Sequence, residues 1–418
     1  MSVAVLIATL SACAGRGQAS PIPRTDRTSA SGPDGSAVPP PAPSATTTIG
    51  QRPPTGFVPA AASFPSSDIG FAWGVYPCAA DPNAFCAGLA VTRDAGSTWK
   101  LRSAPAGTPI DPYHRAILRF ADSNDGWAAL QGSIYATHDG SMTWRSVTLP
   151  GIGANPDVLA VEASGATVYV VAGAPGGAVR LFRSSVTLDD FQPVDDISFP
   201  GAGATVHLSV GDDGSGYLTA DSVAGANPLL YVTDDGVRWV ARASPCTNGS
   251  RTAVAAGRGG NVTVVCDINA SRLGASKQLW TSTNSGSTFV GQEGPAAVGF
   301  TADAASPPLP VTVPPSSGTP PVPTVSYVVA ASALEDRIYL SLNAGRSWTV
   351  AYANSSDASG SALGFADLHF SDPNHGTVIL GNAGVFAKDR LAGSRAVLLP
   401  RLLSTADGGR HWAQTVIQ

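Results

Sequence analysis

From residue 57 onward, short apolar runs alternate with clusters of Gly, Asp, Asn and Ser. Examples of these runs are 134–137, 168–172, 262–266, 327–331 and 337–341. Runs of four to eight residues that are rich in Val, Ile and Tyr and bounded by turn residues predict β-strands. No apolar period of 3.6 residues is sustained over ten residues in this region. We therefore expect 57–418 to form an all-β domain.

A sequence pattern, Ser/Thr-x-Asp-x-Gly-x-x-Trp, recurs along this region. It is complete at 92–99 and 405–412; 137–144 moves the Gly by one place, and 233–239 is one residue shorter. The copies at 282–289 and 341–348 replace Asp by Asn, and a degenerate copy at 184–191 keeps only its aromatic residue. Seven repeats that each supply four short strands predict a seven-bladed β-propeller of four-stranded antiparallel blades.

The residue types of the repeat suit a tight turn. Asp or Asn accepts hydrogen bonds from backbone N–H groups further along the turn, Gly provides positive φ, and Trp packs back over the turn. These roles are structural and imply no catalysis. We assign them to Asp94, Gly96, Trp99, Asp139, Trp144, Asp235, Trp239, Asn284, Phe289, Asn343, Trp348, Asp407, Gly409 and Trp412.

The pattern resembles the BNR or Asp-box repeat of sialidases, sortilin-type receptors and the photosystem II stability factor. This resemblance covers about residues 57–418 and implies a propeller with Asp-box turns. Because the first unit begins on an inner strand and the chain ends on an outer one, we expect each blade to be a continuous stretch of chain. The Pro-rich insertion at about 304–324 is then a solvated spacer in the first turn of the sixth blade. The calcium-like run at 211–216 lacks the spacing of an EF-hand, so turn chemistry is sufficient for it.

The N-terminus reads as a targeting segment. Residues 2–10 are apolar but too few to span a bilayer, and Leu10-Ser11-Ala12-Cys13 matches the bacterial lipobox. We predict a lipoprotein signal peptide at 1–13, lipidation of Cys13, and extracytoplasmic anchoring to the bacterial cell membrane. No Lys or Arg precedes the apolar run, which departs from the usual pattern. Residues 14–56 are rich in Pro, Ser and Gly and predict a disordered tether.

Four cysteines remain for the folded domain, and they allow three pairings. Nearest-neighbour pairing closes the shortest loops, so we expect Cys78–Cys86 and Cys246–Cys266 disulfides. A zinc site is the weaker alternative, because no CxxC or His at ligand spacing is present. We expect no metal and no cofactor.

Charge limits the function classes. The net charge is −5, and only three Lys accompany 22 Arg, so neither a nucleic-acid surface nor a polybasic membrane patch is indicated. Charged residues gather in loops opposite the repeat turns. We predict there a rim that binds a protein or glycan, made of Asp111, Tyr113, His114, Arg115, Lys388, Arg390 and Arg395.

The leading hypothesis is a monomeric, non-catalytic binding propeller of the cell envelope. An exo-sialidase-like glycoside hydrolase is the alternative, and a structural envelope scaffold is the third class. The hydrolase needs three Arg on a carboxylate, a Tyr nucleophile paired with Glu, and an Asp acid/base. The chain has only three Glu: Glu162, which we place after an inner strand, and Glu293 and Glu335, which we place in loops.

Overall fold

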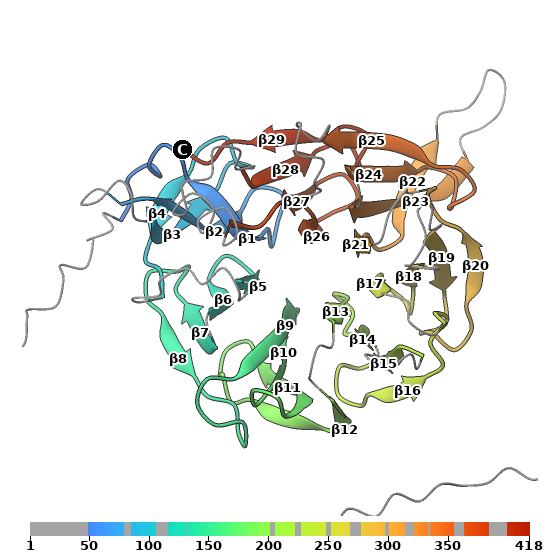
Figure 1. Ribbon diagram of the computed structural model, residues 1–418, viewed down its shortest axis with the longest axis horizontal. Helices are drawn as coiled ribbons and strands as arrows, with labels where there is room; N and C mark the ends of the chain where they lie inside the picture. The colour runs from blue at the N-terminus through green and yellow to red at the C-terminus, as the bar shows by residue number, and fades with distance from the viewer. Residues whose placement is uncertain are drawn as a thin grey trace, which may run out of the picture. The chain divides into compact units, whose positions relative to one another are not determined.

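A computed structural model describes the propeller domain. It describes residues 49–78, 85–105, 116–130, 132–200, 205–221, 227–247, 252–267, 277–296, 301–313, 322–332, 335–354, 363–383 and 399–418. Within them, strands form seven antiparallel sheets, each built from one continuous stretch of chain (Figure 1). The predicted seven-bladed β-propeller with contiguous blades is confirmed.

Blades 1 to 4 each have four strands in sequence order. Their bounds are β1 (Val58–Ser63), β2 (Gly70–Pro77), β3 (Phe85–Thr92) and β4 (Lys100–Arg102); β5 (Ile117–Phe120), β6 (Asp125–Leu130), β7 (Ser133–His138) and β8 (Arg145–Val147); β9 (Asp157–Ser164), β10 (Thr167–Gly173), β11 (Ala178–Ser185) and β12 (Gln192–Pro200); β13 (Val206–Val210), β14 (Gly216–Ala220), β15 (Leu229–Thr233) and β16 (Val240–Arg242).

Blades 5 to 7 follow the same order, with one additional strand in blade 6. Their bounds are β17 (Thr252–Ala256), β18 (Val262–Asp267), β19 (Lys277–Ser282) and β20 (Val290–Glu293); β21 (Thr301–Ala305), β22 (Leu309–Val313), β23 (Val322–Ser332), β24 (Asp336–Ser341) and β25 (Thr349–Asn354); β26 (Phe365–Phe370), β27 (Gly376–Leu380), β28 (Arg401–Thr405) and β29 (Ala413–Thr415).

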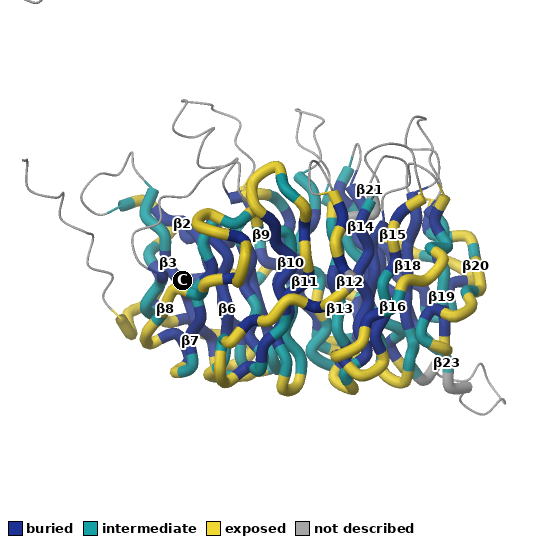
Figure 2. The backbone as a smooth tube through the Cα atoms, turned by 90° about the horizontal axis from the view of Figure 1, so that it is seen from below, coloured by how far each residue is buried: buried dark blue, intermediate teal, exposed yellow. Residues whose placement is uncertain are grey.

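The inner strands close a ring. Each first strand contacts the first strand of the next blade, and β1 contacts β26 of blade 7. The core lies between blades: clusters of buried apolar side chains join every neighbouring pair, including Ile379 of blade 7 with Trp99 of blade 1. Buried residues run along the strands between the two faces, whereas exposed residues concentrate in turns (Figure 2).

Side-chain hydrogen bonds hold the first repeat turn together. The Asp94 carboxylate accepts the backbone N–H of Thr98 at 2.8 Å and the Thr98 hydroxyl at 2.6 Å. Two consecutive residues of the turn have positive φ: Ala95 at 56° and Gly96 at 86°. In the second copy the same pair is Gly140 and Ser141, at 66° and 68°. The turn needs Gly at only one of these places, which explains why the Gly can move by one.

The Trp residues of the repeats act in two ways. In the two complete copies the indole folds onto its own turn, and Trp99 Nε1 donates to the Gly96 carbonyl at 3.1 Å. In variant copies it reaches the preceding blade: Trp144 Nε1 donates to the Ser103 carbonyl at 2.9 Å, and Trp348 Nε1 to that of Glu293 at 3.2 Å. The copies that end at Trp144 and Trp348 therefore fasten one blade to the next.

Two stretches differ from the sequence predictions. The Pro-rich insertion is not only a spacer, since β22 pairs with the first half of β23 and extends blade 6. The folded part also begins before residue 57, because Gly50 N–H donates to the Leu101 carbonyl at 2.9 Å and Leu101 N–H donates to Gln51 at 2.7 Å. Residues 50 and 51 thus bind through their backbone to β4, the outer strand of blade 1.

Both expected disulfides are present. Cys78–Cys86 joins β2 to β3, with Cα atoms 5.1 Å apart, and Cys246–Cys266 joins the segment after β16 to β18, with Cα atoms 5.5 Å apart. The second bridge is buried between blades 4 and 5, where both cysteines are at most 2% exposed. It therefore ties two blades together, whereas the first acts within one blade.

We expect the Cys246→Ala/Cys266→Ala variant to lose about 2–4 kcal/mol of unfolding free energy, because an unfolded chain without the bridge has more conformational freedom. Urea titration monitored by tryptophan fluorescence measures this loss. The Cys78–Cys86 bridge closes a loop of 8 rather than 20 residues, so the matched Cys78→Ala/Cys86→Ala variant should lose less. Equal losses, or a larger loss in the matched variant, would contradict the inter-blade role.

Candidate functional site

The predicted binding rim lies outside the described residues. This holds for all seven of its members, Asp111, Tyr113, His114, Arg115, Lys388, Arg390 and Arg395. It stays a prediction. The described part of the chain contains two other places where polar groups gather: the central channel and a cleft between blades 7 and 1.

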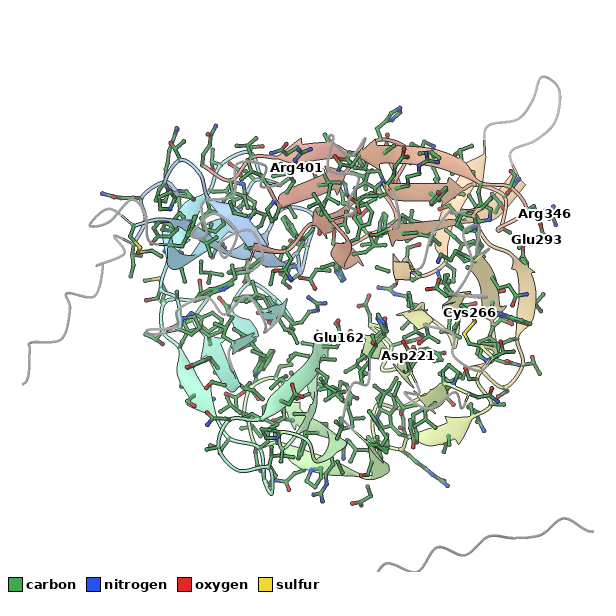
Figure 3. The ribbon with its side chains drawn as sticks, in the orientation of Figure 1. Glu162, Asp221, Cys266, Glu293, Arg346 and Arg401 are labelled. Carbon is green, nitrogen blue, oxygen red and sulfur yellow. A yellow bond between two sulfur atoms is a disulfide. The ribbon has the colours of Figure 1, made fainter. Side chains whose placement is uncertain are left out.

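The channel holds an ion cluster assembled from three blades. Arg119 of β5 donates through Nε to Glu162 of β9 at 2.8 Å, and through Nη2 to Asp367 of β26 at 3.3 Å. Glu162 points from β9 toward the centre of the ring (Figure 3). The sequence placed Glu162 after an inner strand, but it lies within β9. Inner strands alternate their side chains between a seam and the channel, which brings these groups together.

A local irregularity orients Asp367. The pairing of β26 with β27 shifts between Ala366 and His369, and Asp367 has φ of 55°. Its carboxylate is 2% exposed and also accepts the Ala62 backbone N–H at 3.4 Å, across the seam to blade 1. The bulge therefore aims a buried carboxylate at Arg119 and at blade 1.

The Arg119 guanidinium lies between two carboxylates. Burial opposes the charge on Arg119, but Glu162 and Asp367 outweigh it and raise its pKa. Burial raises the pKa of Glu162, although Arg119 works in the opposite direction. The guanidinium is thus already engaged by two carboxylates of its own chain, and this arrangement differs from an arginine waiting for a substrate carboxylate.

The cleft lies at the seam where the ring closes. Its volume is about 420 Å³. Blade 1 contributes Phe64, Ser67 and Ala95. Blade 7 contributes the other lining residues, which are mostly small or hydroxyl-bearing: His369, Ser371, His375, Gly376, Thr377, Ser404, Thr405, Ala406, Asp407, His411, Ala413 and Thr415. The cleft includes both turns of blade 7, so it opens on the face of the repeat turns.

Two histidines of the cleft are oriented by aspartates. His375 Nδ1 lies 2.7 Å from Asp372, and His411 Nδ1 lies 2.6 Å from Asp407. A carboxylate at Nδ1 favours the tautomer that carries its proton there, which leaves Nε2 as an acceptor. Against the cost of burial, hydrogen bonds from His411 and Thr405 lower the pKa of Asp407 to about 2. The carboxylate therefore stays charged and keeps its histidine in place.

His369 connects the cleft with the channel. It lies two residues after Asp367 on β26 and lines the cleft. His369 is exposed on β26, and desolvation by neighbouring groups, together with the Arg119 charge, lowers its pKa. Its neutral imidazole therefore offers both a donor and an acceptor where the channel meets the cleft.

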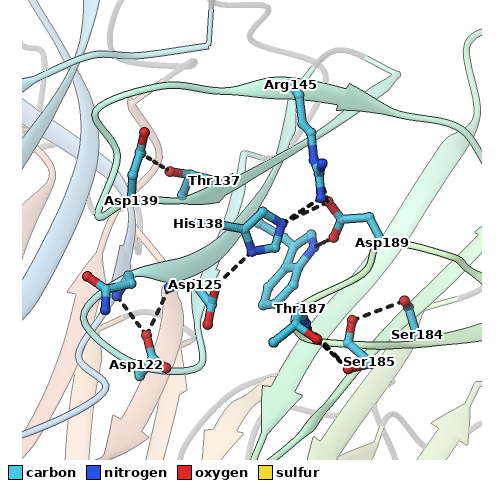
Figure 4. A network of polar contacts seen from close by, with 12 residues as sticks. Asp122, Asp125, Thr137, His138, Asp139, Arg145, Ser184, Ser185, Thr187 and Asp189 are labelled. Atoms are coloured by element: carbon cyan, nitrogen blue, oxygen red, sulfur yellow. Dashed lines mark hydrogen bonds and ion pairs between the residues drawn. The ribbon is translucent and has the colours of Figure 1, made fainter.

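A third polar network fastens blade 2 to blade 3 (Figure 4). His138 Nδ1 lies 2.6 Å from Asp125, and its Nε2 lies 3.0 Å from Asp189. Asp189 also accepts from Trp127 Nε1 at 2.8 Å and from Arg145 Nε at 2.9 Å. Asp189 belongs to the degenerate repeat 184–191, which has no Asp at the usual third position. Contacts from blade 2 therefore support this turn.

This network predicts a pH-dependent contribution to stability. Burial opposes protonation of His138, but hydrogen bonds to Asp189 and Asp125 outweigh it and raise its pKa above 6.5. The stabilisation is therefore complete below about pH 6 and is lost as pH rises through the raised pKa. We expect His138→Gln to cost about 1 kcal/mol of unfolding free energy at pH 5 and less at pH 9. Urea titrations at both pH values measure this difference.

His411→Gln is the control, because the His411 side chain is 88% exposed. Its effect should be small at both pH values. A cost of His138→Gln that grows with pH would contradict the assignment of a charged His138 in the folded protein.

The positions of the glutamates argue against the sialidase alternative. Glu162 is held by Arg119 in the channel, and Glu293 lies at the outer edge, at the end of β20 rather than in a loop (Figure 3). Glu335 is paired with Arg337. Among the described residues, no three His, Cys, Asp or Glu side chains are grouped as metal ligands. Within the same residues, no helix is long and apolar enough to span a membrane.

Comparisons with known proteins bear on the fold alone. No family model matches the chain, and no curated protein matches it. Among solved structures, a prolyl endopeptidase matches with a TM-score of 0.50 at 9% identity, covering 86% of this chain and 49% of that chain. YCF48 bound to D1 peptide matches with a TM-score of 0.49 at 16% identity, covering 80% and 93%. The GH74 xyloglucanase from Xanthomonas campestris matches with a TM-score of 0.42 at 12% identity, covering 86% and 73%. At these identities the likeness concerns the fold alone: the chain is a β-propeller.

Proposed function

We propose that this chain is a non-catalytic recognition propeller, tethered to the outer side of the cell membrane by a lipid on Cys13, that binds a partner in the cell envelope. The observation that carries the proposal is the cleft between blades 7 and 1. It is lined by hydroxyl, imidazole and small apolar groups that suit contact with a ligand. The charged groups beside it are already paired within the chain.

Compartment and anchoring rest on separate observations. Two disulfides suit an oxidising environment outside the cytoplasm. The lipobox motif at residues 10–13 supports lipidation of Cys13. We expect Cys13→Ser to move the protein from the membrane fraction to the soluble fraction. Unchanged membrane association would contradict the lipid anchor but leave the binding proposal intact.

Site-specific photo-cross-linking in whole cells tests the binding. A benzoylphenylalanine at Ala406, a cleft residue, should yield a discrete adduct with one envelope component. The same probe at Thr349, which is exposed on the outer strand of blade 6, is the matched control and should not yield that adduct. The same pattern from both positions, or no adduct from Ala406, would contradict recognition at this cleft. Hydrolysis of a fluorogenic sialoside that is lost in Glu162→Gln would establish the hydrolase instead.

A further inference from the structure

The second strands of the first blades share an aromatic position. In each blade, one residue of the second strand pairs with the first residue of the repeat turn, as Gly70 pairs with Thr92 and Gly126 with Thr137. The aromatic position is the next residue along the second strand. In blades 1 to 4 this position holds a fully buried aromatic residue, at most 1% exposed: Phe71, Trp127, Tyr169 and Tyr217. Aromatic rings are therefore the usual filling at these four seams.

These rings occupy the space beside the next blade. Phe71 stacks on Phe120 of blade 2 with ring centroids 3.5 Å apart. Trp127 donates to Asp189 in the turn of blade 3. The Tyr169 hydroxyl donates to the Gly236 carbonyl in the turn of blade 4 at 2.6 Å. Each ring therefore packs against its neighbouring blade, and two of them end in a hydrogen bond to the neighbour's repeat turn.

At the seam between blades 7 and 1 this ring is missing. Gly376 pairs with Thr405, so the equivalent position is Thr377. Blades 5 and 6 also carry smaller residues there, Thr263 and Val328, but each is completely buried by its surroundings. Thr377 instead retains 8% exposure and lines the open cleft. The space that holds a ring at four other seams is accessible here.

The cleft also offers a partner for a polar ring tip. In their neutral form, His375 and His411 have Nε2 as an acceptor, because aspartates hold their Nδ1 atoms. A phenol hydroxyl can donate to such an acceptor, as Tyr169 donates to the carbonyl of the neighbouring turn. A volume of about 420 Å³ lies near the lower end of ligand pockets, which suits one large side chain with its backbone.

We propose that this cleft binds an aromatic side chain of the partner protein, with tyrosine preferred, in the place that the chain's own rings take at the first four seams. The inference rests on the proposed function and names the chemistry of the partner. The chain's N-terminal segment does not supply the ring, since residues 1–48 contain no Phe, Trp or Tyr. We assign the aromatic residue to a second protein.

Titration of the full chain with amino-acid amides, followed by ligand-observed NMR, tests the proposal. N-acetyltyrosinamide should bind about 3- to 10-fold more tightly than N-acetylphenylalaninamide, because the phenylalanine ring cannot donate a hydrogen bond. N-acetylleucinamide should show no measurable binding. Thr377→Trp restores a ring to the seam and should reduce tyrosinamide binding at least about tenfold, the scale of one lost ring contact.

Two further variants make the result decisive. Ser67→Trp covers the cleft from a partly exposed position of blade 1 and should also block binding, which keeps the test open if Thr377→Trp does not fold. Thr349→Trp adds an exposed indole elsewhere and should bind like the unmodified protein. Undiminished binding in a folded cleft variant, equal binding of the leucine amide, or no binding of any aromatic amide would overturn the inference. A cross-link from Ala406 that persists in those cases would show that the proposed function stands without it.

Discussion

Replacing Asp267 by Asn is expected to lower the unfolding free energy by about 3–5 kcal/mol. Asp267 ends β18, and Lys277 begins β19 opposite it, with Nζ and the carboxylate 2.6 Å apart. Both side chains are 0% exposed. Removing the negative charge takes away the carboxylate that lies 2.6 Å from a buried ammonium, and breaking a buried pair costs much more than the pair itself contributes. Urea titration monitored by tryptophan fluorescence at pH 7 measures the loss.

A double substitution distinguishes an unpaired buried charge from lost packing as the cause of the lower stability. Lys277→Met/Asp267→Leu removes both charges of the pair, and it should recover most of the stability because neither is left buried without the other. If the double variant were as unstable as Asp267→Asn, packing at the base of blade 5 rather than the unpaired charge would explain the loss. If Asp267→Asn cost less than about 1 kcal/mol, water would have to reach Lys277.

Replacing Arg119 by Met should cost about 3 kcal/mol at pH 8. The variant removes the guanidinium that binds Glu162 and Asp367 in the channel, so the pKa of Glu162, which burial already raises, rises further. A folded-state pKa above the unfolded value adds stability at low pH that is lost as pH rises through it. The deficit should therefore be largest at pH 8 and smaller at pH 5. Urea titrations at the two pH values measure it.

Two other variants test the source of the deficit. Arg119→Met/Glu162→Gln removes one of the opposed carboxylates and should recover part of the stability at pH 8. Arg145→Met is the matched control, because that side chain is 56% exposed and its loss should cost much less. A deficit of Arg119→Met that does not change with pH would contradict electrostatic control of the channel cluster.

The sequence was sufficient for the architecture because the repeat is local. Each turn places its acceptor, its positive-φ residues and its Trp within eight positions, so Thr92 to Trp99 carries the whole signal. The same locality explains the disulfides, whose partners are 8 and 20 residues apart. Strand β22 was missed because Pro310 and its neighbours have the composition of a spacer, and only pairing with β23 makes the segment a strand.

The ion cluster in the channel could not be predicted from such local sequence patterns. Arg119 is 43 residues from Glu162 and 248 from Asp367. These residues come together because of which side chains of each inner strand face the channel and because of a bulge in β26. No residue type in β26 predicts this bulge. The cleft did leave a signal. The second strand of blade 7 begins Gly376-Thr377, where blades 1, 2 and 4 have Gly followed by an aromatic residue.

Continuity of each blade along the chain has a consequence for the topology as a whole. Because no strand of the last blade comes from the start of the described chain, the ring contains seven equivalent places at which it can be opened. Phe57 and Ile417 already share one apolar cluster, so the two ends of the domain are near neighbours. A circularly permuted gene that joins these ends and begins at blade 3 would keep every sheet intact and turn the present joint into an ordinary connection.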